Sequence, residues 1–367
     1  MKLLNLKLLN FRNYTKLDLN FNPYKNIIIG KNGMGKTNIV EAIYVLALTK
    51  SFRGSKESVV IKNNSDLCRV EGVIQDKFDN TYKVILKEGE KKVKINNTNI
   101  PKISDYLSKI NVVLFNSEDL ELIKDTPGTR RKIINIELSQ FSNEYLKLLQ
   151  YYNKVLKQRN AYLKTLYING MASKDYLSIL TDQLIDLGLK IYKYRLDFIN
   201  DLNIYVKDNY EKITGNDTLV INYISDYNNL TKEELQKLYK KNMNKDIQYG
   251  KTELGIHHDD FDFSFNNMSL KDYGSEGEQK NAIIAFKIAE MQIFIDKKNI
   301  YPILILDDLF SELDEEKINN ILEFISDDVQ TFVTTTEIDK VQDRLRSNST
   351  IFEVNNGSVI ERNDLNE

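Results

Sequence analysis

The stretch from Asn26 to Thr37 reads NIIIGKNGMGKT, an aliphatic run followed by a glycine-rich loop that ends in lysine and threonine. Gly30, Gly35, Lys36 and Thr37 meet the pattern G-x-x-x-x-G-K-[ST]. Glycine inside regular structure costs stability, so this density of glycines needs a reason. The backbone N–H groups of such a loop and the start of a following helix converge on one anion. The stretch therefore predicts a phosphate-binding loop.

The residues on either side of the loop agree with this prediction. Ile27–Ile29 would form a short buried strand, and the apolar residues after the loop recur at helical spacing, at Ile39, Ala42, Ile43, Leu46 and Ala47. A chance match in a glycine-rich turn is the alternative. We expect a nucleotide with Mg²⁺ here, with Lys36 at the β- and γ-phosphates and the Thr37 hydroxyl on the metal. The nucleotide-binding residues would be Gly30, Lys31, Asn32, Gly33, Met34, Gly35, Lys36 and Thr37.

Composition narrows the class of protein. The 367 residues are 41% hydrophobic and 28% charged, with a formal net charge of −2. A uniformly basic surface is excluded, so any contact with nucleic acid must come from a local patch. The single cysteine, Cys68, excludes an internal disulfide and suits a reducing compartment. Polar residues interrupt the N-terminus, and no apolar run approaches the ~20 residues of a membrane span. We expect a cytoplasmic protein that does not bind membranes.

The pattern of apolar residues predicts strands, then helices, then strands again. Alternation at Leu4–Leu8 and Leu17–Phe21 predicts two strands before the phosphate-binding loop. Further strands are expected at Ser58–Ile61, Cys68–Ile74, Tyr82–Lys87, Val112–Phe115, Leu219–Ser225 and Asp260–Phe265. Between Thr129 and Tyr210 the spacing becomes helical, with a turn near Asn169 and Gly170. These two helices would form an antiparallel hairpin, either as a subdomain with its own core or as an arm for DNA or a partner.

A second motif, YPILILDDLFSELD, places the aliphatic run Ile303–Leu306 before Asp307 and Asp308. Four buried residues without alternation suit a central parallel strand. Ligands of such sheets bind at the carboxyl ends of the strands, which is where the two aspartates would lie. Asp307 could hold Mg²⁺ and Asp308 could polarise an attacking water. An ordinary acidic turn is the alternative, which the phosphate-binding loop makes less favourable.

A third motif, YGSEGEQKN, begins a long helix at Ser275. Ser275 and Glu278 fit the capping box S-x-x-E, which is a purely structural role. The same helix start also presents a hydroxyl and the Gly277 backbone to an anion. One chain has no obvious use for two phosphate sites, but a two-fold dimer does. In such a dimer this helix would face the γ-phosphate bound by the partner.

Taken together, the motifs resemble ABC-type ATPase heads, including those of structural-maintenance-of-chromosomes proteins. The chain is more closely similar to the RecF family of bacterial recombination-mediator ATPases. The segments that carry this resemblance run from residue 4 to residue 314: LLNFRNYTKLDLNF, IIIGKNGMGKTNIVEAIYVLALTKSFR, NSEDLELIKDTPGTRRK, GIHHDDFDF, YGSEGEQK and PILILDDLFSELD.

The resemblance implies an α/β fold, an ABC/SMC-like P-loop head with a mixed sheet and an inserted, mainly helical lobe. Residues 1–120 and 245–367 would form the two parts of the head, and residues 121–244 the lobe with its helical hairpin. Lys36, Asp307 and Asp308 would be catalytic, and Thr37 and Asp307 would bind Mg²⁺. Arg12 and Asn13 would lie near the nucleotide. Ser275, Gly277 and Gln279 would contact it from the partner chain, across a dimer interface that includes Ser311–Asp314. A glutamine-loop equivalent would fall near Asn116–Glu118.

The activity implied by the resemblance is a weak, DNA-stimulated ATPase of recombinational repair and replication restart. ATP would drive homodimerisation on DNA at single-strand gaps and single-strand/double-strand junctions. The dimer would support recombinase loading with RecO and RecR, and slow hydrolysis would reset it. The chain departs from the family at Glu276, Glu278 and Lys280, where two glutamines and an arginine are usual. The extra acids would weaken contact with a γ-phosphate.

Several alternatives stay open at this point. A transporter-type ATPase subunit would dock on a membrane permease, and a P-loop kinase would phosphorylate a small metabolite. A nuclease with an ATPase head would need a further carboxylate cluster. Among the basic residues, Arg53 and the pair Arg130 and Arg131 are candidates for contact with DNA phosphates, although a charge run is usually a solvated face.

Overall fold

The computed structural model describes residues 1–54, 56–169, 173–336 and 348–362. The chain divides into two compact units. Unit 1 comprises Met1–Glu121, Lys212–Gly215 and Ile283–Glu367, and unit 2 comprises Leu122–Glu211 and Asn216–Ala282. The boundary expected between residues 244 and 245 therefore falls inside unit 2.

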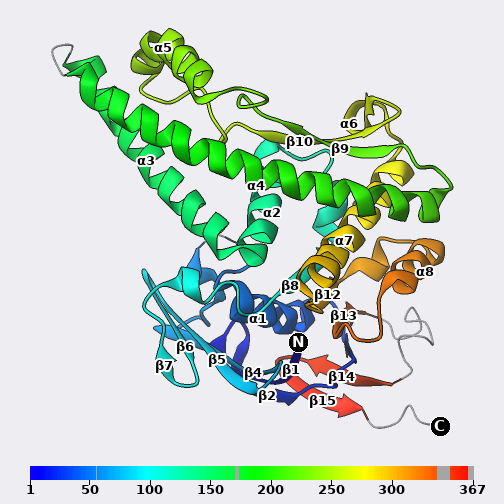
Figure 1. The fold of residues 1–367 in the computed structure, drawn as a ribbon. Helices are drawn as coiled ribbons and strands as arrows, with labels where there is room; N and C mark the ends of the chain where they lie inside the picture. Colours follow the sequence, from blue (N-terminus) through cyan, green and yellow to red (C-terminus); the bar gives the residue numbers. More distant parts are fainter. Residues whose placement is uncertain (55, 170–172, 337–347, 363–367) are drawn as a thin grey trace. The chain divides into compact units, whose positions relative to one another are not determined.

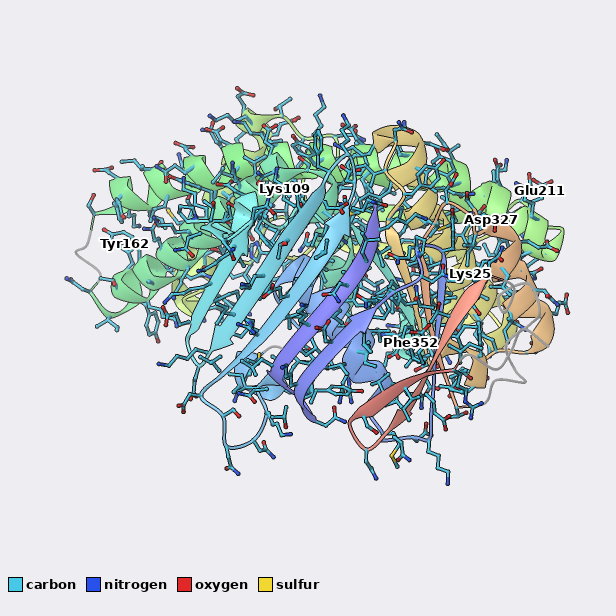
Figure 2. All side chains as sticks on the ribbon, turned by 90° about the horizontal axis from the view of Figure 1, so that it is seen from below. Lys25, Lys109, Tyr162, Glu211, Asp327 and Phe352 are labelled. Atoms are coloured by element: carbon cyan, nitrogen blue, oxygen red, sulfur yellow. The ribbon has the colours of Figure 1, made fainter. Side chains whose placement is uncertain are left out.

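Unit 1 contains a six-stranded antiparallel sheet in the order β2-β1-β4-β5-β6-β7. Figure 2 shows its longer strands side by side. Apolar side chains alternate along β2, β4 and β5, so one face of these strands is buried and the other carries polar residues, the pattern of an antiparallel sheet. The strands are β1 (Lys2–Phe11), β2 (Tyr14–Asn20), β4 (Leu67–Gln75), β5 (Asp79–Lys87), β6 (Glu90–Ile95) and β7 (Thr98–Asn99).

The second sheet of unit 1 is mixed, in the order β15-β14-β3-β13-β12-β8. Its strands pair in parallel except for β14 with β15. Every residue of β12 and β13 is buried, as expected for central strands covered on both faces. The strands are β3 (Lys25–Ile29), β8 (Val112–Asn116), β12 (Ile303–Asp307), β13 (Thr331–Thr335), β14 (Ser349–Asn355) and β15 (Ser358–Arg362).

Helix α1 (Lys36–Leu48) packs on strands of both sheets, including β4 and β13 (Figure 1). Most of its side chains are buried, because the helix has a sheet on each side. Unit 1 also contains most of α7 (Glu276–Lys298), which begins in unit 2, and α8 (Glu315–Phe324). Short 3₁₀ helices are η1 (Glu57–Val60), η2 (Ile103–Asp105), η3 (Ser117–Glu121) and η4 (Leu309–Ser311).

Unit 2 is mainly helical, with α2 (Pro127–Phe141), α3 (Asn143–Ile168), most of α4 (Lys174–Thr214), α5 (Lys232–Tyr249) and α6 (Leu270–Tyr273). A small antiparallel sheet in the order β11-β10-β9 completes it, from β9 (Leu219–Ile224), β10 (Asp260–Phe265) and β11 (Met268–Ser269). Leu163, Leu166 and Leu177 form a core cluster between α3 and α4, and Met243 and Ile247 of α5 pack against it.

Most of the expected elements are confirmed, including the strands on either side of the helical region and the two long helices α3 and α4. Gly170, in the expected turn between these helices, lies outside the described residues. The strand expected at Ser58–Ile61 is wrong, because this segment forms η1 and only Ile61 makes an isolated bridge, to Phe11. In the part of the chain that the structure covers, we find no helix long and apolar enough to cross a membrane.

Candidate nucleotide-binding site

The phosphate-binding loop joins β3 to α1 in unit 1. Its backbone needs glycine, because Gly33 and Gly35 have φ angles of 80° and 114°. A Cβ atom at Gly35 would lie 2.6 Å from Asn13 Nδ2, and one at Gly30 would lie 2.4 Å from the Val354 carbonyl oxygen. Positive φ angles and close neighbouring atoms therefore explain why this loop contains glycines.

Lys36, the first residue of α1, turns back into this loop. Its ammonium group donates to the Lys31 carbonyl at 3.2 Å and lies 3.5 Å from Asn32 Oδ1. The side chain is only 5% exposed, and burial lowers the pKa of its ammonium group, against the opposing effect of Asp308 and Asp307. An anion held in the loop would stabilise this buried charge.

Asp307, the last residue of β12, meets the phosphate-binding loop. The hydroxyl of Thr37 donates to Asp307 Oδ1 at 3.0 Å, and the hydroxyl of Thr334 on β13 donates to the same oxygen at 2.7 Å. Burial raises the pKa of the Asp307 carboxyl, although both hydrogen bonds oppose that effect. A hydroxyl beside a carboxylate offers the hard oxygen donors that Mg²⁺ takes, so Thr37 and Asp307 fit the metal.

Asp308 has a different environment. Its backbone is left-handed, with φ of 50°, and its N–H donates to the Thr334 hydroxyl at 2.9 Å. Its side chain is partly exposed, and the Ser311 hydroxyl lies 3.1 Å from Asp308 Oδ1 and 2.8 Å from its carbonyl oxygen. The two adjacent acids therefore differ, one buried beside Thr37 and the other accessible to water.

The turn between β1 and β2 lies against the loop, as expected for Arg12 and Asn13. Asn13 Nδ2 donates to the Met34 carbonyl at 3.2 Å, and the Tyr14 hydroxyl donates to the Gly35 carbonyl at 3.1 Å. Arg12 has a φ angle of 51°, and its side chain contacts Glu41. The Nε and Nη2 groups of Arg12 donate to the two oxygens of that carboxylate, at 2.8 and 2.5 Å.

Two residues of the site, Glu41 and Thr334, were not predicted. Glu41 lies on α1 and is completely buried; besides Arg12, it accepts from the Ser51 hydroxyl at 2.5 Å and has Arg53 Nη1 at 3.9 Å. An acid on an otherwise apolar helix face was the available sequence signal for Glu41. Thr334 had no comparable signal, because a threonine near the end of a buried strand is ordinary.

In unit 2 the helix start at Ser275 forms the expected capping box. The Ser275 N–H donates to Glu278 Oε2 at 2.8 Å, and the Glu278 N–H donates to the Ser275 hydroxyl oxygen at 3.3 Å. Ser275 and Gly277 are exposed. Gln279, which we expected to be presented to a nucleotide, is instead 4% exposed, and its amide donates to the Leu270 and Gly274 carbonyls.

Arg130 and Arg131 were expected to be available for contact with DNA phosphates. Arg130 is 5% exposed and forms two hydrogen bonds with the Asp260 carboxylate, at 2.7 and 2.8 Å. Arg131 donates to the Asp259 carbonyl at 2.5 Å. These interactions hold α2 against the start of β10. The Arg130 side chain is therefore used in the interior of unit 2, whereas Arg131 is only partly buried and its contact with DNA phosphates stays a prediction. Arg53 has an exposed side chain and donates to Asn38 Oδ1 at 3.1 Å.

Known proteins are similar to this chain over nearly its whole length. The family model described as RecF/RecN/SMC N terminal domain matches residues 2–359. The DNA replication and repair protein RecF of Halalkalibacterium halodurans is 40% identical over 364 residues, which cover 96% of this chain and 98% of the relative. The protein of the same name from Staphylococcus carnosus is 38% identical over 370 residues, covering 98% of this chain and 100% of the relative.

Solved structures agree with the sequence comparison. A structure of the recombination mediator protein RecF with ATP, from the RecFOR pathway, matches with a TM-score of 0.91 and 29% identity, covering 98% of this chain and 97% of that chain. The SMC head bound to the C-terminal winged-helix domain of ScpA matches with a TM-score of 0.55 and 17% identity, covering 99% of this chain and 98% of that chain, which shows a shared fold. The fold is therefore that of an ABC/SMC-like ATPase head.

Proposed function

The chain belongs to the RecF/RecN/SMC N-terminal domain family, and we propose that it is an ATP-dependent DNA-binding protein of recombinational DNA repair and replication restart. The observation that carries the ATP-dependent part of this proposal is the hydrogen bond from Thr37 to Asp307, and the DNA-repair part is supported by the similarity to RecF proteins. This hydrogen bond joins a phosphate-binding loop near the N-terminus to an acidic strand end 270 residues later in the chain. This contact supports the proposal, because a P-loop ATPase needs a phosphate-binding loop and an acidic strand end close together.

ATP would bind with its phosphates in the loop formed by residues 30–37. Lys36 would exchange its bonds to Lys31 and Asn32 for bonds to the β- and γ-phosphates. Thr37 and Asp307 would hold Mg²⁺, which supplies charge neutralisation at the phosphate oxygens. Asp308, which is accessible to water, would orient a water molecule and accept its proton as the water oxygen attacks the γ-phosphorus. The bond to the β–γ bridging oxygen would then break, leaving ADP and inorganic phosphate.

The switch we propose is a homodimer that closes around two nucleotides. Ser275 and Gly277 are exposed at a helix N-terminus, where backbone N–H groups favour an anion. Each protomer would present this helix start to the γ-phosphate held by its partner, so ATP would link the two chains. Hydrolysis would remove that link and open the dimer. Hydrolysis would set how long the dimer stays closed, so ATP turnover would be slow. DNA would stimulate this turnover.

The proposed partners follow from the relatives. RecF proteins matched here are named for DNA replication and repair, and a matched structure describes a recombination mediator of the RecFOR pathway. We propose that this chain acts at single-strand gaps and at junctions of single- and double-stranded DNA, and supports recombinase loading with RecO and RecR. Its place of action would be the cytoplasm.

Molecular mass by light scattering tests the proposal. The wild-type protein is measured with ATP, with ADP and without nucleotide, each with and without gapped DNA. We expect a dimer only with ATP, stabilised by DNA. Lys36→Ala should remove the dimer by removing nucleotide binding, whereas Ser275→Arg should keep nucleotide binding and lose the dimer. A constant monomer that still hydrolyses ATP would overturn the dimer switch, and a protein that binds no DNA would overturn the repair function.

A further inference from the structure

Helix α5 of unit 2 has a basic face. Its buried side is formed by Leu235, Tyr239 and Asp246. Away from this buried side, exposed lysines recur every four residues, at Lys237, Lys241 and Lys245. With a rise of 1.5 Å per residue, successive lysines lie about 6 Å apart along the helix axis. Figure 1 shows α5 beside the ends of α3 and α4.

This spacing of lysines does not favour the helix itself. Like charges four residues apart on a helix are destabilising. Glu233 and Glu234 of the first turn lie four and three residues before Lys237 and offset the repulsion there. Neither Lys241 nor Lys245 has an acid three or four residues away on either side. Asp246 is buried, and its carboxylate is already paired with Arg159 at 2.8 Å. The helix dipole gives no explanation either, because its effect is confined to the last turn and the last turn of α5 carries no basic residue.

A second group of lysines adjoins the C-terminal end of α5. Lys157 and Lys164 are exposed on one face of α3, with Asn160 between them. The side-chain oxygen Oδ1 of Asn160 accepts from the Thr252 N–H at 2.8 Å, which brings this face against the segment that follows α5. The Lys164 side chain packs on Gly250, since a Cβ atom there would lie 2.8 Å from Lys164 Cγ.

Acidic groups offset part of this positive charge, and Glu234 does so at Lys237. Lys251 and Lys245 share the carboxylate of Glu253, at 3.0 and 3.6 Å. The hydrogen bond from Lys251 lowers the pKa of that carboxyl, so Glu253 stays ionised at neutral pH. We call the six exposed lysines of α3, α5 and the following segment the α5 lysine surface: Lys157, Lys164, Lys237, Lys241, Lys245 and Lys251.

Two exposed tyrosines lie at the point where these helices meet. Tyr249 is 55% exposed and precedes Gly250, four residues after Lys245. Tyr167 is 66% exposed and follows Lys164 by three residues, so both belong to the same side of α3. Lysines that follow a phosphate backbone, combined with aromatic rings on which bases stack, are the usual means of binding a single strand. In a duplex the bases are paired and stacked, so such rings would have no partner.

We propose that the α5 lysine surface, with Tyr167 and Tyr249, binds single-stranded DNA. The inference rests on the proposed DNA-binding function and deepens it, because it assigns the single-stranded side of a gap to unit 2. The lysines supply the affinity through phosphate contacts, which carry no sequence preference. The tyrosines supply the preference for unpaired bases.

The salt dependence of binding tests the lysines. Binding of the full-length protein to a labelled oligothymidylate is measured by fluorescence anisotropy over a range of salt concentrations. The slope of log K against log salt is negative, and each phosphate contact on a single strand contributes ~0.7 to its magnitude. The variant Lys237→Glu/Lys241→Glu/Lys245→Glu should therefore reduce the magnitude of this slope by about 2. Its control, Lys190→Glu/Lys193→Glu/Lys207→Glu on α4, makes the same change in net charge and should leave the slope unchanged. Equal slopes for the two variants would overturn the proposal.

The rings are tested by strand type. Tyr167→Ala/Tyr249→Ala should lower the affinity for oligothymidylate about tenfold or more, from the stacking lost per base. Affinity for a blunt duplex should not change, and the melting temperature should match that of the wild type because both rings are exposed. An equal loss on both DNA forms, or no loss, would overturn the single-strand assignment. A wild-type protein that binds neither DNA would instead overturn the proposed function and the inference with it.

Discussion

The phosphate-binding loop of unit 1 and the start of α7 in unit 2 are both glycine-containing helix starts, but their surroundings differ. At the loop, a Cβ atom on Gly35 would lie 2.6 Å from Asn13 Nδ2, and Lys36 is buried. At the start of α7, a Cβ atom on Gly277 would meet nothing within 4 Å, and Ser275 is exposed. The first region is packed by the rest of its own unit, whereas the second is not.

The electrostatics of the two regions differ in the same way. Burial raises the pKa of the Asp307 carboxyl beside the loop. The hydrogen bond from the Ser275 hydroxyl lowers the pKa of Glu278 at the start of α7. Asp307 is therefore held in an environment that favours a cation, while Glu278 already satisfies its helix terminus. A helix N-terminus binds an anion when neighbouring groups support the charge. At the loop, Lys36 of the same unit is such a group, whereas the start of α7 is hydrogen-bonded to Glu278.

The largest effect is expected for Lys36→Ala. It removes the charged donor at the phosphates, so ATP affinity measured by calorimetry should fall roughly a hundredfold. Lys31→Ala, whose side chain is exposed in the same loop, should change affinity much less. If the two variants bound ATP equally well, Lys36 would not be the residue that binds the phosphates in this loop.

A smaller effect separates the two glycines. Gly35→Ala should lower the free energy of unfolding by roughly 2 kcal/mol, because its φ of 114° and its contact with Asn13 both oppose a side chain. Gly277→Ala should leave that free energy unchanged or raise it by up to about 1 kcal/mol. Urea unfolding of both proteins without nucleotide is the measurement. Equal losses would remove the structural contrast between the regions.

Glu278→Gln tests whether the start of α7 faces a phosphate. Its side-chain oxygen can still accept from the Ser275 N–H, so the unfolding free energy should change little. Removing one negative charge should strengthen an ATP-dependent dimer up to about fivefold, the scale of an exposed charge interaction. Dimer dissociation is followed by sedimentation, with Glu233→Gln on α5 as the control. An unchanged or weaker dimer would show that this helix start does not face a phosphate.

The smallest effect concerns pH and Asp307. A folded-state pKa raised above 3.8 means that the free protein binds more protons than its unfolded chain above that pH. The stability of the nucleotide-free protein should therefore fall as pH rises from 3.8 to the folded-state pKa, and Asp307→Asn should lack this contribution. Mg²⁺-dependent ATP affinity should rise with pH over the same window. Identical pH profiles of urea unfolding for both proteins would refute this account of the carboxyl.

Local patterns explain why so much of the fold could be predicted. Alternating apolar residues mark β1, β2, β4 and β5, because each strand has one buried face. The strand expected at Ser58–Ile61 failed for a tertiary reason. Arg12 N–H donates to the Val60 carbonyl and Lys62 N–H to the Asn10 carbonyl, so the segment is held by a few contacts with the end of β1 and never pairs as a strand.

Three features could be predicted from local sequence, because each is an arrangement of backbone and neighbouring side chains: the phosphate-binding loop, the acidic strand end and the capping box at Ser275. Which of these groups meet depends on how the chain folds. Thr334 reaches Asp307, Glu41 holds Arg12, and Arg130 is used up by Asp260. Such pairings depend on which strands become neighbours and which side chains lose water, and residues far apart in the chain carry no local record of either.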